Sequence, residues 1–245
     1  MPTPIVEVTG LSTWLGERWV HRNLDLSVQR GEILVIAGGS GTGKTVLLRT
    51  MIDLIQPAAG TVSVMGQVLS KLTEAQRVAL QERWGVLFQQ NALFSSLSIL
   101  DNVAFPLREK TRLDQDMIRE LALLKLLLAG LKPEVASRYP AELSGGMQKR
   151  AALARAIVLD PEIVFLDEPT AGLDPPLVAA FDRLILNLQQ SLGFTIVMVT
   201  HDLQSIRRTA NRVAFLGEGR VLCVEPPEQV VQFPHPLVQA FFAGQ

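Results

Sequence analysis

Several features are scarce in this 245-residue chain, and each scarcity excludes a class of protein. A single cysteine, Cys223, excludes an internal disulfide, and its apolar neighbours predict a buried, inert thiol. The longest apolar stretch, 121–131, contains Lys125 and is shorter than the ~20 residues that a membrane-spanning helix needs. The N-terminus lacks a basic region followed by an apolar core, so we expect no secretory signal.

Charge of one sign is also scarce, because 23 Lys and Arg residues balance 24 Asp and Glu residues and leave a net charge of −1. This balance gives no reason to expect nucleic acid or an anionic lipid surface as a partner. With 48% hydrophobic and 19% charged residues, the composition is globular, and the length suits one α/β domain with a large core. We therefore expect a single domain over residues 1–245, cytoplasmic and reaching a membrane only through a partner.

Turn residues divide the chain into strand-like and helix-like segments. Apolar runs predict strands at 5–8, 24–28, 32–37, 61–65, 163–166, 195–200, 213–216 and 221–224. Helical periodicity predicts helices near 47–55 and at 116–131, 148–159, 177–191 and 203–210. This order indicates a mostly parallel sheet with helices on its faces, and an inserted helical subdomain at about 95–159.

Eight residues directly after the 32–37 strand match the phosphate-loop pattern G-x-x-x-x-G-K-[ST]. They are Gly38, Gly39, Ser40, Gly41, Thr42, Gly43, Lys44 and Thr45. Glycines let backbone N–H groups approach phosphate oxygens, and the next helix points its positive end at the same anion. Lys44 would reach the β- and γ-phosphates of ATP, and the Thr45 hydroxyl would ligate Mg²⁺. The alternative, a turn that only joins a strand to a helix, is disfavoured by the complete match in this context.

Two adjacent carboxylates end the apolar strand at 163–166. Asp167 would hold Mg²⁺, and Glu168 would orient or deprotonate the attacking water. Ligands bind at the carboxyl ends of strands in parallel sheets, which is where these side chains are expected. By itself the Asp167-Glu168-Pro169 sequence could be a solvated turn; the phosphate loop upstream favours the catalytic interpretation.

Four further segments, taken with these two, resemble the motifs of ATP-binding cassette (ABC) ATPases. Leu143-Ser144-Gly145-Gly146-Met147 resembles the signature motif, and Ala171-Gly172-Leu173-Asp174 resembles the D-loop. Gln89 resembles the Q-loop glutamine, and His201 the switch histidine. The resemblance covers about residues 5–224. It implies a P-loop ATPase fold with a mostly parallel core sheet, an N-terminal antiparallel β-subdomain, an inserted α-helical subdomain and a short C-terminal segment at 225–245.

The resemblance also implies roles for these residues. Glu168 and His201 would be catalytic, and Mg²⁺ would be held by Thr45, Gln89 and Asp167. The chain would form a head-to-tail homodimer with ATP between the phosphate loop of one copy and the signature of the other. The second copy would contribute Ser144, Gly145, Gly146 and Asp174 to that site. A helix N-terminus at Ser144 would give a second anion site.

A closer resemblance is to the ATPase subunits of Mla-type (MCE-linked) lipid transporters. It rests on 88–94, on 101–109, on Met147 and on the ending at 238–244. It implies an inner-membrane permease as partner, together with small regulatory and MCE lipid-binding subunits. It also implies a place at the cytoplasmic face of the bacterial inner membrane and transport of phospholipid.

Two departures from the family pattern affect the expected site. Met147 stands where most cassette ATPases have glutamine, which affects only the local contacts of that side chain. The adenine-stacking aromatic usually lies just before a glycine in the first hairpin, whereas Leu15 precedes Gly16 here. Trp14 is our candidate for stacking on adenine, and a core or rim role is the alternative.

The segment Asn91–Glu109 is where we expect the permease to dock. It follows Gln89 directly and carries Leu93, Phe94 and Leu97, which either form a docking surface or belong to the core. A transporter ATPase for another substrate is the nearest alternative function. A soluble ABC ATPase of DNA repair or ribosome function is the other, but the chain has neither a long coiled-coil insertion nor a second cassette.

Overall fold

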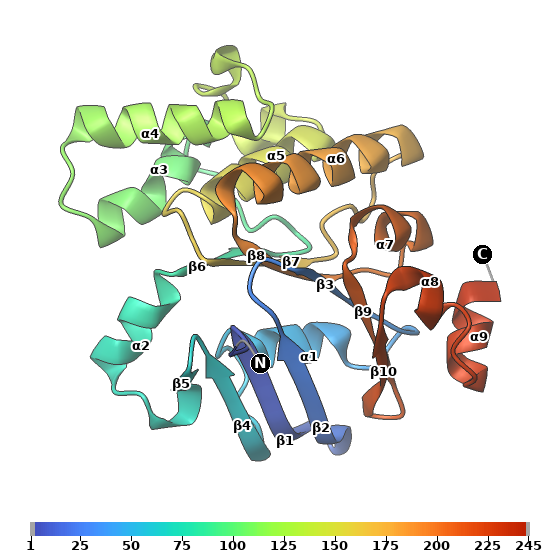
Figure 1. Cartoon of the computed structure of the whole chain (residues 1–245). Helices are drawn as coiled ribbons and strands as arrows, with labels where there is room; N and C mark the ends of the chain where they lie inside the picture. The colour runs from blue at the N-terminus through green and yellow to red at the C-terminus, as the bar shows by residue number, and fades with distance from the viewer. Residues whose placement is uncertain (1–2, 244–245) are drawn as a thin grey trace. The chain divides into compact units, whose positions relative to one another are not determined.

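The computed structural model describes residues 3–243, which divide into two compact units (Figure 1). The first unit combines the chain before residue 80 with the chain after residue 194. The second unit is the continuous segment 80–194. Gly244, at the end of the C-terminal segment noted in the sequence, lies outside the described residues.

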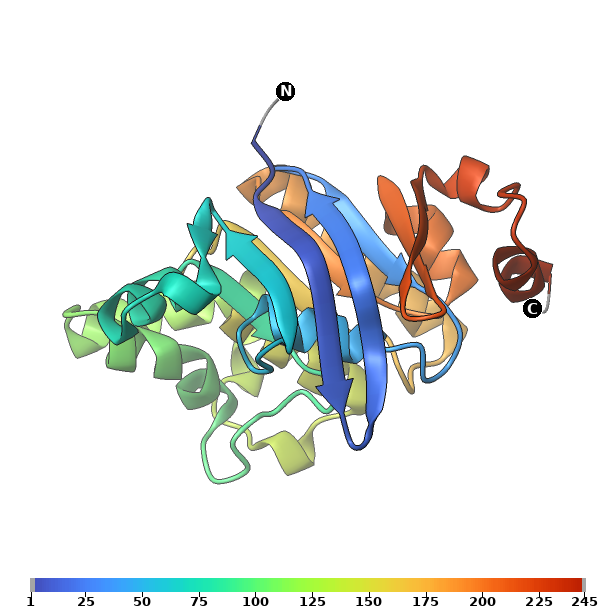
Figure 2. The ribbon, with the colours of Figure 1, turned by 90° about the horizontal axis from the view of Figure 1, so that it is seen from below.

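The first unit contains an antiparallel sheet of order β2-β1-β4-β5 (Figure 2). Its strands are β1 (Val6–Leu15), β2 (Arg18–Val28), β4 (Ala59–Val64) and β5 (Gln67–Val68). β1 and β2 are much longer than the runs at 5–8 and 24–28, because their outer halves carry exposed side chains that break the apolar pattern. The hairpin between them is therefore a structural element that apolar periodicity alone did not reveal.

The same unit contains strands around the buried β3 (Ile33–Ala37). β3 pairs in parallel with β8 (Thr195–Val199) and β9 (Arg212–Gly217), and β10 (Arg220–Glu225) pairs antiparallel with β9. All five side chains of β3 are buried, as the continuous apolar run predicts. The remaining elements are α1 (Lys44–Met51), η1 (Leu69–Lys71), α7 (Leu203–Thr209), α8 (Pro227–Val230) and α9 (Pro236–Ala243), and α2 (Glu74–Gln81) runs across the boundary between the units.

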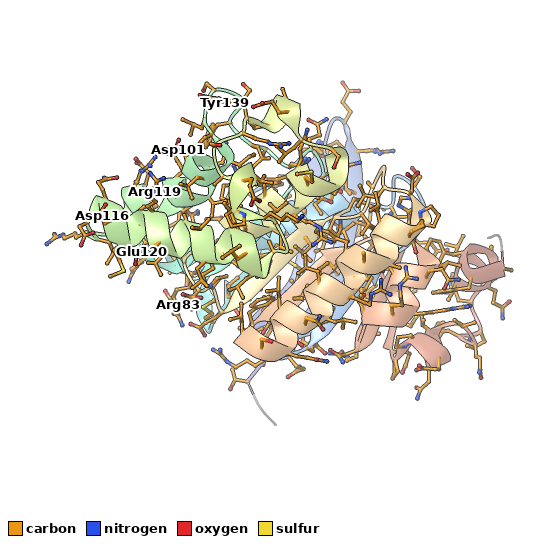
Figure 3. All side chains as sticks on the ribbon, turned by 90° about the horizontal axis from the view of Figure 1, so that it is seen from above. Arg83, Asp101, Asp116, Arg119, Glu120 and Tyr139 are labelled. Atoms are coloured by element: carbon orange, nitrogen blue, oxygen red, sulfur yellow. The ribbon has the colours of Figure 1, made fainter. Side chains whose placement is uncertain are left out.

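The second unit pairs β6 (Trp84–Leu87) in parallel with β7 (Ile163–Asp167). Its helices are α3 (Ile99–Lys110), α4 (Gln115–Leu128), α5 (Gly145–Ala156) and α6 (Pro175–Leu192), with short 3-10 segments η2 (Pro133–Val135) and η3 (Pro140–Glu142). An apolar core joins α3, α4 and α5, with Val103, Leu126 and Ala151 fully buried. The outer side of α4 carries the exposed polar residues Asp116, Arg119 and Glu120, which Figure 3 labels. The helices expected at about 95–159 are therefore present in this unit.

Candidate functional site

The phosphate loop, residues 38–45, joins β3 to α1 within the first unit. Gly38 has φ 147°, and a Cβ there would lie 2.3 Å from the carbonyl oxygen of Leu216. Gly43 is the N-cap of α1 with φ 100°, a left-handed conformation that favours glycine. The Lys44 ammonium donates to the carbonyl oxygens of Gly38 and Gly39, each at 2.8 Å. The loop is thus a tightly built turn that presents the N-terminus of a helix, the geometry that an anion requires.

A buried polar pair packs beneath this loop. The Thr13 hydroxyl lies 2.7 Å from His21 Nδ1, and both side chains are fully buried. Burial lowers the pKa of His21 to about 4, so the imidazole is neutral at physiological pH. A Cβ at Gly43 would lie 2.6 Å from His21 Nε2. The contact of His21 with the phosphate loop could not be predicted, because the two lie 22 residues apart in the chain and no motif links them.

A cavity of about 230 Å³ opens beside the phosphate loop. It is lined by Arg18, Trp19, Val20, Gly41, Thr42, Glu218 and Gly219. Trp14, our candidate for stacking on adenine, is half-exposed and is not among these residues. Its ring meets Trp19 edge to face, with centroids 5.1 Å apart. Trp19 is therefore an aromatic lining residue that the spacing to Gly16 did not identify.

His201 follows β8 in the same unit and is exposed. Asp202, the next residue, caps α7 by accepting a hydrogen bond from the backbone N–H of Ser205 at 2.7 Å. The histidine therefore stands at a fixed junction between a buried strand and a capped helix. This is the position that the sequence pattern predicts for it.

The other predicted site residues lie in the second unit. Asp167 is the buried last residue of β7, and Glu168 follows in a left-handed conformation with φ 49°. Asp174 is exposed at the N-cap position of α6. Gln89 is exposed after β6, and its backbone carbonyl accepts a hydrogen bond from Lys149 Nζ at 3.2 Å. The unusual backbone of Glu168 turns the chain sharply at the end of the strand, where a catalytic carboxylate was predicted.

The signature residues form the N-terminus of α5, which begins at Gly145 and not near 148 as predicted. Ser144 is the N-cap, with its hydroxyl 3.4 Å from the backbone nitrogen of Met147. Helical periodicity misplaced this start because two glycines occupy the first turn. Gly145 is exposed, and a Cβ there would meet nothing within 4 Å. No acidic side chain occupies the first turn of this 12-residue helix, so its N-terminus can accept an anion.

Met147, the departure from the usual signature, packs partly buried against the helical core. The neighbouring Gln148 donates to the carbonyl oxygens of Pro140 at 3.0 Å and Leu143 at 3.2 Å. The side chain at 147 therefore contributes apolar packing, while Gln148 holds the chain that leads into the signature.

Comparisons with known proteins agree with these features. The family model for "ABC transporter" matches residues 21–171. The intermembrane phospholipid transport system ATP-binding protein MlaF of Haemophilus influenzae is 38% identical over 98% of this chain and 91% of its own. The probable ribonucleotide transport ATP-binding protein mkl of Mycobacterium tuberculosis is 37% identical over 98% of this chain and 67% of its own. The chain therefore belongs to the ABC transporter family, and it is an ATP-binding ATPase of that family.

A solved structure supports the same fold. A dimeric ATP-binding cassette in a post-hydrolysis state, bound to ADP and phosphate, has a TM-score of 0.83 and 31% identity, over 91% of this chain and 98% of its own. The fold class predicted from the sequence is confirmed by this similarity. Among residues 3–243, no helix is both long and apolar enough to span a membrane.

Proposed function

We propose that this ATPase powers a membrane transporter that moves phospholipid between bacterial membranes. The main support for this proposal is the similarity of this chain, over nearly the full length of both proteins, to an intermembrane phospholipid transport ATP-binding protein. The mycobacterial relative, named for ribonucleotide transport, makes another cargo the alternative. On this proposal the ATPase lies at the cytoplasmic face of the inner membrane, attached to a permease and accompanied by small regulatory and MCE lipid-binding subunits.

The phosphate loop would hold the phosphates of ATP, with Lys44 beside the β- and γ-phosphates. Thr45, Asp167 and Gln89 offer the hydroxyl, carboxylate and amide oxygens that Mg²⁺ prefers. Within the described residues, no group of three or more His, Cys, Asp and Glu side chains could hold a metal ion. Mg²⁺ would therefore depend on phosphate oxygens and water for its remaining ligands, as is usual for this ion.

Glu168 would orient or deprotonate the attacking water, and His201 would contact the γ-phosphate. Replacing Glu168 by Gln should keep ATP binding and slow turnover by about 10² or more. Undiminished ATP turnover by Glu168→Gln would remove that residue from the catalytic role.

Lys44→Ala should abolish nucleotide binding or turnover in a folded protein.

Two copies would associate, as the dimeric form of the solved relative suggests, and the resemblance of the signature motif implies a head-to-tail arrangement. Each nucleotide would then lie between the phosphate loop of one copy and the signature of the other. Ser144 and the backbone amides of Gly145 and Gly146 would bind the γ-phosphate from across the interface, and Asp174 would lie beside it. ATP would hold the dimer closed, and hydrolysis would remove that attraction.

The permease would dock at an apolar groove of about 480 Å³ in the second unit, here called the docking groove. Its lining residues are Gln81, Glu82, Trp84, Gly85, Val86, Phe88, Phe94, Phe105, Pro106, Glu109, Lys110, Arg155, Ala156 and Leu159. Phe94 and Phe105 are exposed, and their rings pack 4.9 Å apart. Leu93 and Leu97 are half-buried, and Leu93 packs against the helical core. The expected segment Asn91–Glu109 thus contributes part of the groove, through its aromatic residues.

A groove lined mostly by apolar side chains, with charged residues among them, suits a short amphipathic helix presented by a membrane protein. Two of the charged residues, Lys110 and Glu82, form an ion pair with N and O 3.8 Å apart. We expect Phe94→Asp to release the ATPase from membranes and leave nucleotide affinity intact. Leu124→Asp is the matched control, because Leu124 is equally exposed, on α4, and does not line the groove.

The test combines copurification from detergent-solubilised membranes with transport in reconstituted vesicles. Retention of Phe94→Asp on the permease would place docking elsewhere. ATP-dependent transfer of labelled phospholipid would support the proposed cargo. Ribonucleotide uptake without phospholipid transfer would replace it with the alternative.

A further inference from the structure

The turn that follows Gln89 has an unusual backbone and an unusual partner. Asn91 and Ala92 have φ 62° and 50°, both in the left-handed region, which alanine adopts rarely. Their carbonyl oxygens accept hydrogen bonds from one guanidinium, that of Arg155 on α5. The distances are 2.8 Å to Asn91 and 2.7 Å to Ala92. A single side chain of the signature helix therefore donates hydrogen bonds to two consecutive residues with left-handed backbones.

Further contacts tie α5 to the same segment. Lys149 is buried and donates to the carbonyl oxygen of Gln89. The side-chain amide nitrogen of Asn91 lies 3.5 Å from Gln148 Oε1. A Cβ at Gly85 in β6 would lie 1.9 Å from the carbonyl oxygen of Ala156, so strand and helix backbones touch. The strand before Gln89 and the turn after it are thus both fixed to α5.

Arg155 also reaches the docking groove. Its guanidinium carbon lies 5.9 Å from the centre of the Phe94 ring, and both side chains line the groove. This distance is within the range of a cation–π interaction. A molecule that displaced Phe94 would therefore act on the same guanidinium that holds the turn after Gln89.

From this geometry we propose that Arg155 is a positioning residue that latches the Gln89 segment to the signature helix, so that the two move as one body. The proposal rests on the roles proposed above for Gln89, Ser144 and the docking groove. A change at the γ-phosphate, sensed by Gln89, would then reach the signature through a stiff connection. A change in the groove would travel the same way. Such a discrete packed link is what carries coupling between separated sites.

The test measures the link directly, through nitroxide labels at Gln90→Cys and Ala141→Cys. Both positions are exposed, one in the turn after Gln89 and one before the signature. The native Cys223 is buried, and burial raises the pKa of its thiol to about 11, so it reacts slowly with the label. The substitution Cys223→Ala removes this thiol from the experiment. We expect one narrow distance distribution in the parent protein, with and without a non-hydrolysable ATP analogue.

Arg155→Met should broaden this distribution or make it change with nucleotide. It should also lower kcat at least about tenfold while the Kd for ATP changes less than about threefold, because positioning and not binding is lost. Arg155→Lys keeps the charge but cannot hold both carbonyls with a planar guanidinium. Its distance distribution and its kcat should therefore lie between those of the parent protein and those of Arg155→Met. It serves in place of Arg155→Met if the latter fails to fold.

Arg150→Met is the matched control. Arg150 lies on the same helix but donates to the carbonyl oxygen of Ala129, at the end of α4 and 2.9 Å away. A distribution that stays narrow in both Arg155 variants, or that broadens equally in Arg150→Met, would overturn the latch. These distances are measured without ATP turnover. They therefore test whether Arg155 holds the turn after Gln89 even if Gln89→Ala and Ser144→Arg show that Gln89 and Ser144 lack the roles proposed for them.

Discussion

The imidazole of His21 is buried beneath the phosphate loop, hydrogen-bonded to Thr13 and shielded from water. Its folded pKa is about 4, against an ordinary value of 6.5. An unfolded His21 takes up a proton as the pH falls through 6.5, while the folded one does not. Unfolding is therefore favoured progressively between pH 6.5 and 4.

We predict that this histidine reduces the free energy of unfolding by about 2–3 kcal/mol between pH 7 and pH 4. Urea unfolding at several pH values would measure the change. His21→Gln removes the titrating group, so the difference between the two proteins isolates its contribution. Parallel pH profiles for the parent and the variant would show that His21 titrates normally in the folded protein.

The two tryptophans of the first hairpin give a second prediction at this scale. Trp19 lines the cavity beside Gly41 and Thr42, and Trp14 packs on it from the side. If the cavity receives adenine, Trp19→Ala should raise the KM for ATP by about tenfold, the value of one lost aromatic stack. Trp14→Ala should raise it less. The reverse order would restore Trp14 as the stacking residue.

Among the elements, β6 and α5 approach more closely than side chains would allow. Gly85→Ala would place a Cβ against the carbonyl oxygen of Ala156. Neither atom can turn away, because one is attached to the backbone of β6 and the other belongs to the backbone of α5. We predict a loss of about 2 kcal/mol or more in stability, measured by urea unfolding. Gly145→Ala is the control, because its Cβ would meet nothing. Equal stability of the two variants would contradict this packing.

The elements also show what the sequence could reveal. Buried β3 and β7 were predicted within a residue or so, because every side chain is apolar until the site begins. The contacts of Arg155 and His21 could not be predicted, because they join residues 63 and 22 positions away from their partners in the chain. The partners of Arg155 are two backbone carbonyls, and no pattern in its own helix indicates them. Periodicity records burial, and it carries no information on which carbonyl a buried cation meets.

For the whole molecule, the proposed head-to-tail dimer predicts complementation between two inactive variants. Mixing equal amounts of Lys44→Ala and Ser144→Arg chains should make half of the dimers mixed, each with one intact site. ATP turnover should then return to about a quarter of the parent value if the sites act independently. Turnover that equals the average of the separate variants would show that the signature does not complete the site of another copy.

The first unit is assembled from both ends of the chain, and this arrangement has a consequence for its biosynthesis. β3 emerges from the ribosome early, but its neighbours β8 and β9 lie beyond the intervening segment 80–194. At a synthesis rate of about 5–20 residues per second, the apolar strand waits on the order of ten seconds for its partners. The second unit is continuous and can fold during that interval. The nascent phosphate loop, which follows β3 directly, is therefore among the last parts to reach its final form, and it stays accessible to chaperones during that interval.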